Sequence, residues 1–275
     1  MMRLLVFVFF LIGYYASESH ALELPQSDTV PGGVAILEIG EAEATKPEAR
    51  FGKKKVMVVA NAGKWLAVVG LPLDLKPGRH TIDIRLEGYN DWRPVAFEVD
   101  DKRYTEQRLT IKNKRKVDPN EEDMKKIRED NSKIARAKRT WTETVKTVRF
   151  DIPATGIRSS EFGLRRFFND QPRRPHGGID IAAPQGTPVY APADGVVTEA
   201  DDFFFSGNCI FIDHGQGLTT FYAHLSKIDV KPGQTVEKGQ KIAEIGETGR
   251  VTGPHLHWSV GLNQTWVDPD LFLNP

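Results

Sequence analysis

Five of the seven histidines in this chain of 275 residues lie between His176 and His257. His176 stands four residues before Asp180, and His255 stands two residues before His257. On a β-strand, side chains two or four positions apart project from the same side, so each pair can reach one ion. A His/Asp/His set of nitrogen and oxygen donors suits Zn²⁺, and three protein ligands leave a fourth position open. The spacing therefore predicts an open, catalytic zinc site rather than a closed structural one.

Each of these motifs alone is a weak signal. Two His separated by one residue arise often, and a His four residues from an Asp can be an ordinary salt bridge on a helix. Gly177 and Gly178 argue against a helix at that point. A third motif, Phe221–Leu225, carries His224 and lies between the two pairs. Their occurrence together in one glycine-rich segment favours the metal site.

The segment that must position these residues is 148–275. It is rich in Gly and Pro, and it contains short Val- and Ile-rich runs that follow turn signals such as Gly186-Thr187-Pro188 and Lys231-Pro232-Gly233. Helical periodicity is almost absent. This pattern predicts a compact, mostly antiparallel β domain with tight turns.

Two further regions precede that domain. Residues 22–111 contain short period-two runs, such as 81–86 and 95–99, between turn signals, which predicts a small β-sandwich accessory domain. Residues 112–147 form a predicted charged helical linker, in which 17 of the 28 residues from 112 to 139 are charged. Asp118 as the N-cap with Pro119 at the first helical position predicts the start of its helix. An apolar stripe predicts that the helix docks one edge onto a domain; its members are Met124, Ile127, Ile134 and Trp141. The fold class is therefore mainly β.

The first 21 residues predict a secretory signal peptide. Arg3 precedes a continuous apolar run, and Ser19-His20-Ala21 offers small residues before a cleavage site. A retained anchor is the alternative, but the run from Leu4 to Tyr15 is shorter than the ~20 residues that span a bilayer. No later segment reaches that length, so no transmembrane segment is expected after cleavage.

Charge and cysteine content exclude other classes. Lys plus Arg and Asp plus Glu each number 37, so the chain has no net charge and a polybasic nucleic-acid binder is excluded. The single Cys, Cys209, can form neither an internal disulfide nor a Cys-rich zinc module. It is interpreted as a small core residue, with a reactive thiol as the alternative. His80 and His214 are interpreted as structural, with a contact behind the metal site as the alternative for His214.

From about Ser159 to Asn263 the sequence closely resembles the lysostaphin-type, or LytM-type, zinc peptidases, which cut peptide bonds in bacterial peptidoglycan. The motifs that carry the resemblance are Phe162-Gly163-Leu164-Arg165-Arg166, Arg174-Pro175-His176-Gly177-Gly178-Ile179-Asp180-Ile181-Ala182, Tyr222-Ala223-His224-Leu225 and Gly253-Pro254-His255-Leu256-His257-Trp258. The resemblance implies one zinc ion per peptidase domain, bound by His176, Asp180 and His257. It also implies that His224 and His255 are catalytic. No metal or catalytic position of the family is missing.

The implied chemistry is coherent. Zinc can lower the pKa of bound water from ~15.7 to ~7, and a nearby His can stabilise an oxyanion or move a proton. The chain has no HExxH motif, so a carboxylate base of that type is not available. His224 and His255 must share the acid–base and electrostatic work, and the sequence does not divide those roles.

The resulting hypothesis is an exported zinc metalloendopeptidase that hydrolyses cross-links or stem peptides of peptidoglycan, in the periplasm of a Gram-negative bacterium. The resemblance suggests D-alanyl–diaminopimelate cross-links. The alternative is a non-catalytic cell-envelope scaffold or amidase regulator that docks protein partners through its N-terminal domain, and a zinc carboxypeptidase is a further one. The linker or the sandwich is expected to cover part of the groove in a resting state.

Overall fold

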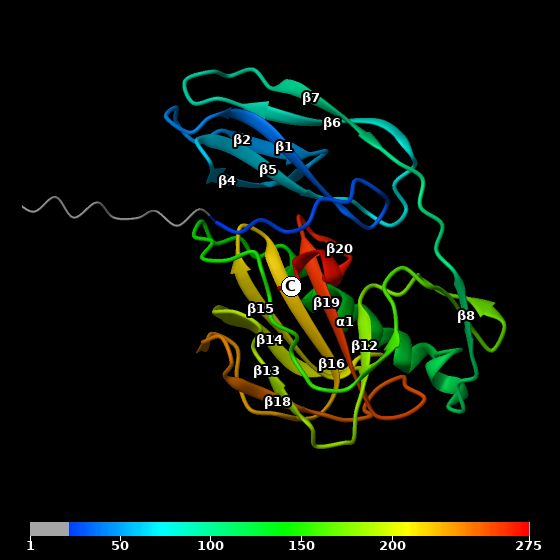
Figure 1. Cartoon of the computed structure of the whole chain (residues 1–275). Coiled ribbons are helices and arrows are strands. Elements are labelled where there is room, and N and C mark those ends of the chain that lie inside the picture. The colour runs from blue at the N-terminus through cyan, green and yellow to red at the C-terminus, as the bar shows by residue number, and fades with distance from the viewer. Residues whose placement is uncertain (1–21, 275) are drawn as a thin grey trace, which may run out of the picture.

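The protein is described by a computed structural model of residues 22–274, which fold mainly into antiparallel β-structure, as predicted (Figure 1). The predicted signal peptide, residues 1–21, lies outside the described residues. Within residues 22–274, no helix is long and apolar enough to cross a membrane.

The N-terminal region is a sandwich of two antiparallel sheets. Their strand orders are β1-β5-β4 and β3-β2-β6-β7. The strands are β1 (Val34–Glu41), β2 (Glu48–Phe51), β3 (Lys54–Lys55), β4 (Met57–Asn61), β5 (Lys64–Gly70), β6 (Gly78–Arg85) and β7 (Arg93–Val99). In β6, Ile82 and Ile84 face the core between the two sheets, whereas Asp83 and Arg85 lie on the outer side, which explains the period-two pattern.

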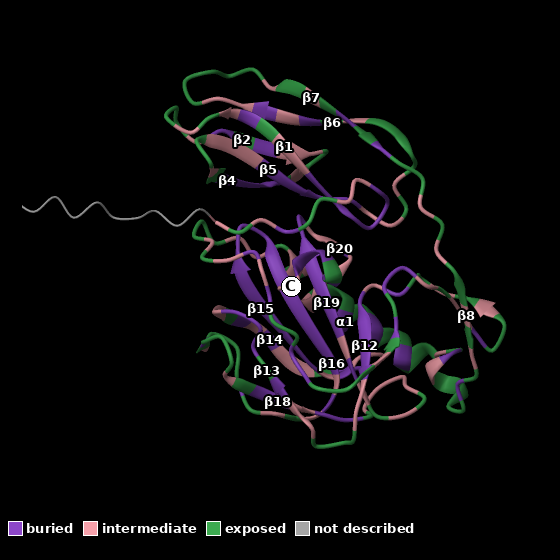
Figure 2. Cartoon of the chain, in the orientation of Figure 1, coloured by how far each residue is buried: buried purple, intermediate pink, exposed green. Residues whose placement is uncertain are grey.

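The sheet β1-β5-β4 is covered on both faces (Figure 2). Val58 and Val69 pack into the sandwich core, whereas Met57 and Val68 pack into the core of the C-terminal region. A strand buried on both faces needs apolar residues at successive positions, which accounts for the unbroken apolar runs in β4 and β5. The sandwich is therefore docked onto the C-terminal region through a packed apolar face.

The C-terminal region is built on one ten-stranded sheet. Its strands are β9 (Ile157–Ser160), β12 (Ile179–Ala182), β13 (Pro188–Tyr190), β14 (Gly195–Phe203), β15 (Gly207–Gly215), β16 (Leu218–Ile228), β17 (Thr235–Val236), β18 (Lys241–Ile245), β19 (His255–Leu262) and β20 (Thr265–Val267). The main path is β17-β14-β15-β16-β19-β12-β9. The central position of β16 and β19 matters because both strands carry candidate site residues.

A fourth, small sheet joins the two regions. It consists of β8 (Glu106–Leu109), β10 (Arg165–Phe168) and β11 (Gln171–Pro172), and β8 pairs with β10 in parallel. The strand that follows the sandwich is thus hydrogen-bonded beside the strand that precedes His176. The 3₁₀ helices η1 (Lys114–Lys116) and η2 (Pro269–Phe272) lie before α1 and at the end of the described chain.

The charged linker contains α1 (Glu121–Lys138), the one α-helix among the described residues. The predicted start was wrong by two residues: the N-cap is Asn120, not Asp118. The Asn120 side chain accepts from the Asp123 backbone N–H at 2.9 Å, and the Asp123 carboxylate accepts from the Asn120 N–H at 3.2 Å. This reciprocal capping box satisfies two backbone donors at once, which a Pro119 start does not.

The predicted docking edge of α1 is confirmed in part. Ile127 is buried, and Ile134 packs with Ala137 against a cluster that contains Phe203 and Cys209. Met124 is exposed, and Trp141 lies beyond the end of the helix, so neither belongs to the docked edge. The buried Cys209 is a core residue, and burial raises the pKa of its thiol.

Candidate active site

The strand register brings Asp180 and His257 together. The strands β12 and β19 are antiparallel neighbours, and Asp180 lies directly opposite His257 in their ladder. His255 and His257 project to one side of β19, while the intervening Leu256 is buried on the other. The predicted shared face is therefore confirmed for His255 and His257. For His176 and Asp180 it was wrong, because β12 (Ile179–Ala182) begins after His176 and only Asp180 lies in the strand.

His176 approaches from a loop that two backbone hydrogen bonds fix. Its N–H donates to Leu164 O at 2.9 Å, and its carbonyl accepts from Gly163 N–H at 2.8 Å. The Nδ1 of His176 lies 2.7 Å from Glu161 O. Because a carbonyl only accepts, Nδ1 carries the proton and Nε2 is directed to Asp180 and His257.

Three candidate ligand atoms converge on one point. His176 Nε2, Asp180 Oδ1 and His257 Nδ1 are each 2.9 Å from the other two. A tetrahedral zinc ion with bonds of ~2.0–2.1 Å separates its ligand atoms by ~3.3 Å, so a shift of a few tenths of an ångström admits the ion. The residues present thus fit zinc in donor type, number and spacing.

Electrostatics also favour a cation here. Burial acts to raise the pKa of Asp180, but its contacts with the His176 and His257 rings outweigh it and hold that pKa well below 3.8. Burial lowers the pKa of His257 to about 4. A carboxylate that stays ionised beside an imidazole that stays neutral is the protonation state that a metal requires.

His224 and His255 lie beside this triad. Their ring centroids are 4.8 Å apart, and the His224 ring is 6.2 Å from that of His257. Each Nδ1 lies against a backbone carbonyl, Thr248 O at 2.8 Å for His224 and Gly253 O at 2.9 Å for His255. Each Nε2 is therefore free to exchange a proton.

The environment of His224 keeps it neutral. Burial, followed by the neighbouring His255 and His257, holds the pKa of His224 well below 6.5. Its backbone has φ of 66°, an uncommon value for a residue with a side chain. Strain of this kind is often found at functional sites, where the surrounding structure holds the residue in place.

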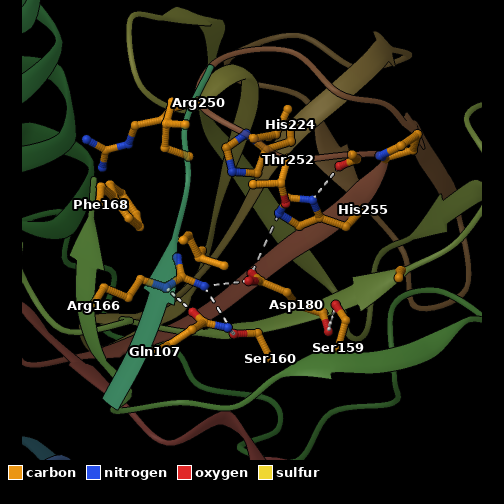
Figure 3. A pocket seen from close by; sticks show the side chains of 16 residues that line it. Gln107, Ser159, Ser160, Arg166, Phe168, Asp180, His224, Arg250, Thr252 and His255 are labelled. Atoms are coloured by element: carbon orange, nitrogen blue, oxygen red, sulfur yellow. Dashed lines mark hydrogen bonds and ion pairs between the residues drawn. The ribbon is translucent and has the colours of Figure 1, made fainter. Parts of the chain in front are cut away.

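The sequence did not predict the side chains that orient Asp180 through its second carboxylate oxygen, Oδ2. Arg166 Nη2 donates to Asp180 Oδ2 at 2.6 Å, which leaves Oδ1 for the metal point (Figure 3). Gln107, from β8, accepts from Arg166 Nε at 2.9 Å and donates to Ser160 Oγ at 3.0 Å. Arg166 belonged to a motif of the resemblance, but its contact with Gln107 depends on the pairing of β8 with β10, which no local pattern indicated.

The metal point opens into a cleft of about 300 Å³ (Figure 3). One wall comes from the segment after the sandwich, and the opposite wall is the loop that precedes β19. The lining residues include Gln107, Leu109, Ile111, Ser159, Phe168, Arg250, Thr252 and Pro254. No residue of the charged linker, 112–147, lines the cleft, so the contribution of the segments before the peptidase domain comes from Gln107, Leu109 and Ile111.

Two other histidines lie away from the cleft. His214 is buried, with Nδ1 2.8 Å from Asp194 O and Nε2 2.8 Å from Thr220 Oγ1. His80 lies in β6 of the sandwich. The structure therefore gathers the five predicted site residues, His176, Asp180, His224, His255 and His257, and leaves these two apart.

Comparisons with known proteins agree with this geometry. Residues 174–269 match "Peptidase family M23", and residues 27–102 match "Peptidase family M23 N-terminal domain". A solved structure of a peptidase M23 from Pseudomonas aeruginosa is 38% identical, with a TM-score of 0.75, over 90% of this chain and 95% of that one.

Curated relatives match over part of this chain. The peptidoglycan DD-endopeptidase ShyA of Vibrio cholerae is 50% identical over 103 residues, which are 37% of this chain and 24% of that protein. The DD-carboxypeptidase/endopeptidase Mpg of Neisseria meningitidis is 47% identical over 111 residues, 40% of this chain and 26% of that protein. The alignments thus span about a quarter of the length of these relatives.

Proposed function

Because the chain belongs to peptidase family M23, we propose that it is a zinc metalloendopeptidase that hydrolyses peptide bonds of bacterial peptidoglycan. The observation that carries the proposal is the convergence of three ligand atoms, 2.9 Å apart, beside two histidines in an open cleft. The names of the relatives, a peptidoglycan DD-endopeptidase and a DD-carboxypeptidase/endopeptidase, support the choice of substrate.

In this proposal His176, Asp180 and His257 hold one zinc ion. The chemistry that a bound zinc ion supplies is Lewis acidity, which lowers the pKa of water and polarises a carbonyl oxygen. Arg166 occupies Oδ2 of Asp180 at 2.6 Å and so directs Oδ1 toward the ion.

The two remaining histidines of the cleft handle protons. His224 and His255 have protonated Nδ1 atoms bound to carbonyls, so each Nε2 can accept a proton, and can return it to the leaving amine. An imidazole that has taken up a proton also stabilises negative charge on the substrate oxygen. The two rings are 4.8 Å apart, so both reach one scissile bond and share these tasks.

The organisation of the chain follows the same proposal. Residues 1–21 are a signal peptide, 22–111 a β-sandwich accessory domain, 112–147 a charged helical linker and 148–275 the peptidase domain. Action on peptidoglycan requires the cell envelope, and the signal peptide directs the chain to the periplasm. The sandwich offers a surface for envelope protein partners. Residues 107–111 line the cleft, which supports the expectation that the segments before the peptidase domain control access to it.

Digestion of purified sacculi tests the activity. The zinc-loaded chain is expected to release products that a His176→Ala variant does not, and separation of the products by chromatography identifies the cleaved bond. Cleavage of D-alanyl–diaminopimelate cross-links is the expected result. The variant His80→Ala, which changes a histidine of the sandwich, is the matched control and should keep full activity.

The same experiment separates the alternatives. A folded, zinc-loaded chain that releases nothing from sacculi would overturn the proposal and favour a scaffold or amidase regulator. Release of terminal residues alone would indicate a carboxypeptidase.

A further inference from the structure

A second cavity, of about 470 Å³, lies where the sandwich, α1 and the peptidase region meet. Four cationic side chains line it, with the amide side chains of Asn131 and Gln264 beside them. The cations are Lys54 of β3, Lys138 and Arg139 at the end of α1, and Arg174 of the loop before His176. Positive groups from three separate parts of the chain thus face one space.

No carboxylate balances this charge. The lining contains no Asp or Glu. Across the part of the chain that the structure describes, none of the four cations makes an ion pair. Three other cations of α1 do have carboxylate partners, because Lys126 pairs with Asp130, Lys133 with Asp201 and Arg136 with Glu199. Among the described residues, Lys125 and Arg128 make no ion pair either, but both are exposed to solvent, whereas Lys138 faces the cavity with three further cations.

Among these cations, Lys138 is the one whose charged form is disfavoured. Its ammonium lies 4.1 Å from the centroid of the Trp266 ring. Burial, followed by the charges of Lys54 and Arg174, lowers the pKa of Lys138 to about 7. A bound anion would relieve both effects, since it would offset the repulsion and stabilise the charged ammonium.

Lys138 links the cavity to the side chains that pack around the metal site. The Trp266 ring beneath its ammonium is stacked on Phe221 at 5.8 Å, and Phe221 meets the His257 ring edge-on at 6.0 Å. A Cβ added at Gly177 would come within 2.8 Å of Trp266, so the His176 loop lies against the same ring. An occupant that contacts Lys138 would therefore be one side chain away from the packing that supports two candidate metal ligands.

We propose that this cavity binds a free carboxylate of a peptidoglycan stem peptide, as a second attachment point outside the cleft. The proposal rests on the proposed function for the identity of the polymer. Its chemistry rests on the cavity, because ammonium, guanidinium and amide groups all donate to carboxylate oxygens. The volume of about 470 Å³ is many times the ~30 Å³ of one water, which fits a peptide group rather than a lone ion.

A second attachment point has a physical benefit on a polymer. Stem peptides repeat along the wall and carry free carboxylates, so binding of one raises the effective concentration of its neighbours at the cleft. The net charge of the whole chain is zero, so this attraction must come from a local cluster of cations.

Binding of a soluble stem tripeptide, L-alanyl-γ-D-glutamyl-diaminopimelate, to the full zinc-loaded chain tests the proposal by calorimetry. The tripeptide has no cross-link to cleave. We expect about tenfold weaker binding to Lys138→Met and to Lys54→Ala, and unchanged binding to Lys125→Met, which alters an exposed lysine of the same helix. The wild-type chain should bind an analogue with carboxamides in place of the carboxylates about as weakly as the lysine variants bind the tripeptide.

The pH dependence provides a second readout. The charged groups that face Lys138 across the cavity are Lys54, Arg139 and Arg174. Affinity should fall up to about tenfold from below pH 7 to pH 8, because neutral Lys138 must take up a proton to bind the anion. This fall should be lost in Lys138→Met.

Equal binding to the wild type and both lysine variants would overturn the inference. Inorganic phosphate is the competing probe, and phosphate binding that the tripeptide cannot displace would also overturn it, because the site would then serve another anion. Digestion of sacculi by the same preparations keeps the two proposals apart. Cleavage without lysine-dependent binding refutes the second site alone, and lysine-dependent binding without cleavage refutes the peptidase alone.

Discussion

Two histidines of the hairpin formed by β15 and β16 differ in how their ring nitrogens are used. At the core end of the hairpin, His214 has both nitrogens bound, Nδ1 to Asp194 O and Nε2 to Thr220 Oγ1. At the cleft end, His224 has Nδ1 bound to Thr248 O, while its Nε2 faces the cleft. Both are held neutral by burial. The first contributes to stability, and the second is held in place but can still react.

The contact between the sandwich and the peptidase region extends the comparison. Gln216 accepts from Val58 N–H at 2.9 Å, and Asn263 accepts from Gly70 N–H at 2.6 Å and donates to Gly70 O at 3.0 Å. All of these polar groups are paired within the protein. Side chains whose polar atoms are all hydrogen-bonded within the protein stabilise the fold in these two places. At the cleft, by contrast, His224 has one ring nitrogen bound and the other directed into the cleft.

The largest effect is expected when His224, whose Nε2 faces the cleft, is replaced. His224→Asn should lower hydrolysis of sacculi by about 10²–10⁴-fold, the usual contribution of a general acid or base. Asn tolerates the positive φ of 66° at this position, so the fold should persist. Zinc content and the unfolding transition should match the wild type, and activity near the wild-type level would place the proton transfer elsewhere.

The matching test replaces Asn263, whose side-chain amide is hydrogen-bonded to Gly70 at the contact between the sandwich and the peptidase region. Asn263→Ala leaves the buried N–H and C=O of Gly70 without partners and should lower the free energy of unfolding by about 2–4 kcal/mol. Denaturant unfolding measures this change. Asn263→Asp, which can still accept from Gly70 N–H, should lose less. Hydrolysis by the folded fraction should stay unchanged, because Asn263 does not line the cleft.

His214 should make stability depend on pH. Burial lowers its pKa from 6.5 to about 4, so between these values the unfolded chain binds a proton that the folded chain does not. Stability is then full above pH 6.5 and falls as the pH drops toward 4, by up to about 3 kcal/mol. Unfolding of the wild type and of His214→Gln over pH 4–7 gives the difference. Parallel curves for the two proteins would show that His214 does not carry this dependence.

The sequence predicted what local periodicity controls. His255 and His257 could be assigned to one face of a strand because the side-chain period of a strand is two. The same argument failed for His176 and Asp180, because the two glycines between them precede β12 and leave His176 in a loop. The helix start was missed because Asn120 and Asp123 cap it reciprocally two residues after the Asp118-Pro119 signal.

Local sequence patterns could not predict the contacts between segments that are far apart in the chain. Gln216 and Asn263 meet strands 158 and 193 residues away, and nothing in their own neighbourhood indicates a partner. Gln107 lies 59 residues before Arg166, and only the parallel pairing of β8 with β10 brings the two together. These contacts depend on the packing of the whole chain, which local propensity does not encode.

Arg166 lies between the two classes, because its Nε and Nη2 have partners within the protein and yet it contacts the candidate metal centre. Arg166→Leu should weaken zinc binding by about 10–100-fold, as expected when a group that orients a metal ligand is lost. Competition with a chromophoric chelator measures the zinc affinity directly, without reliance on turnover. Arg165→Leu is the matched control, since Arg165 pairs at the surface with Glu106, 3.3 Å away, and should leave zinc binding unchanged.

Gln107→Ala should cause a smaller loss of zinc affinity than Arg166→Leu, because Ser160 Oγ still contacts the guanidinium at 3.2 Å. Equal zinc affinity in Arg166→Leu and Arg165→Leu would show that Asp180 is oriented by its strand alone, and the cleft would then need no support from the segment that follows the sandwich.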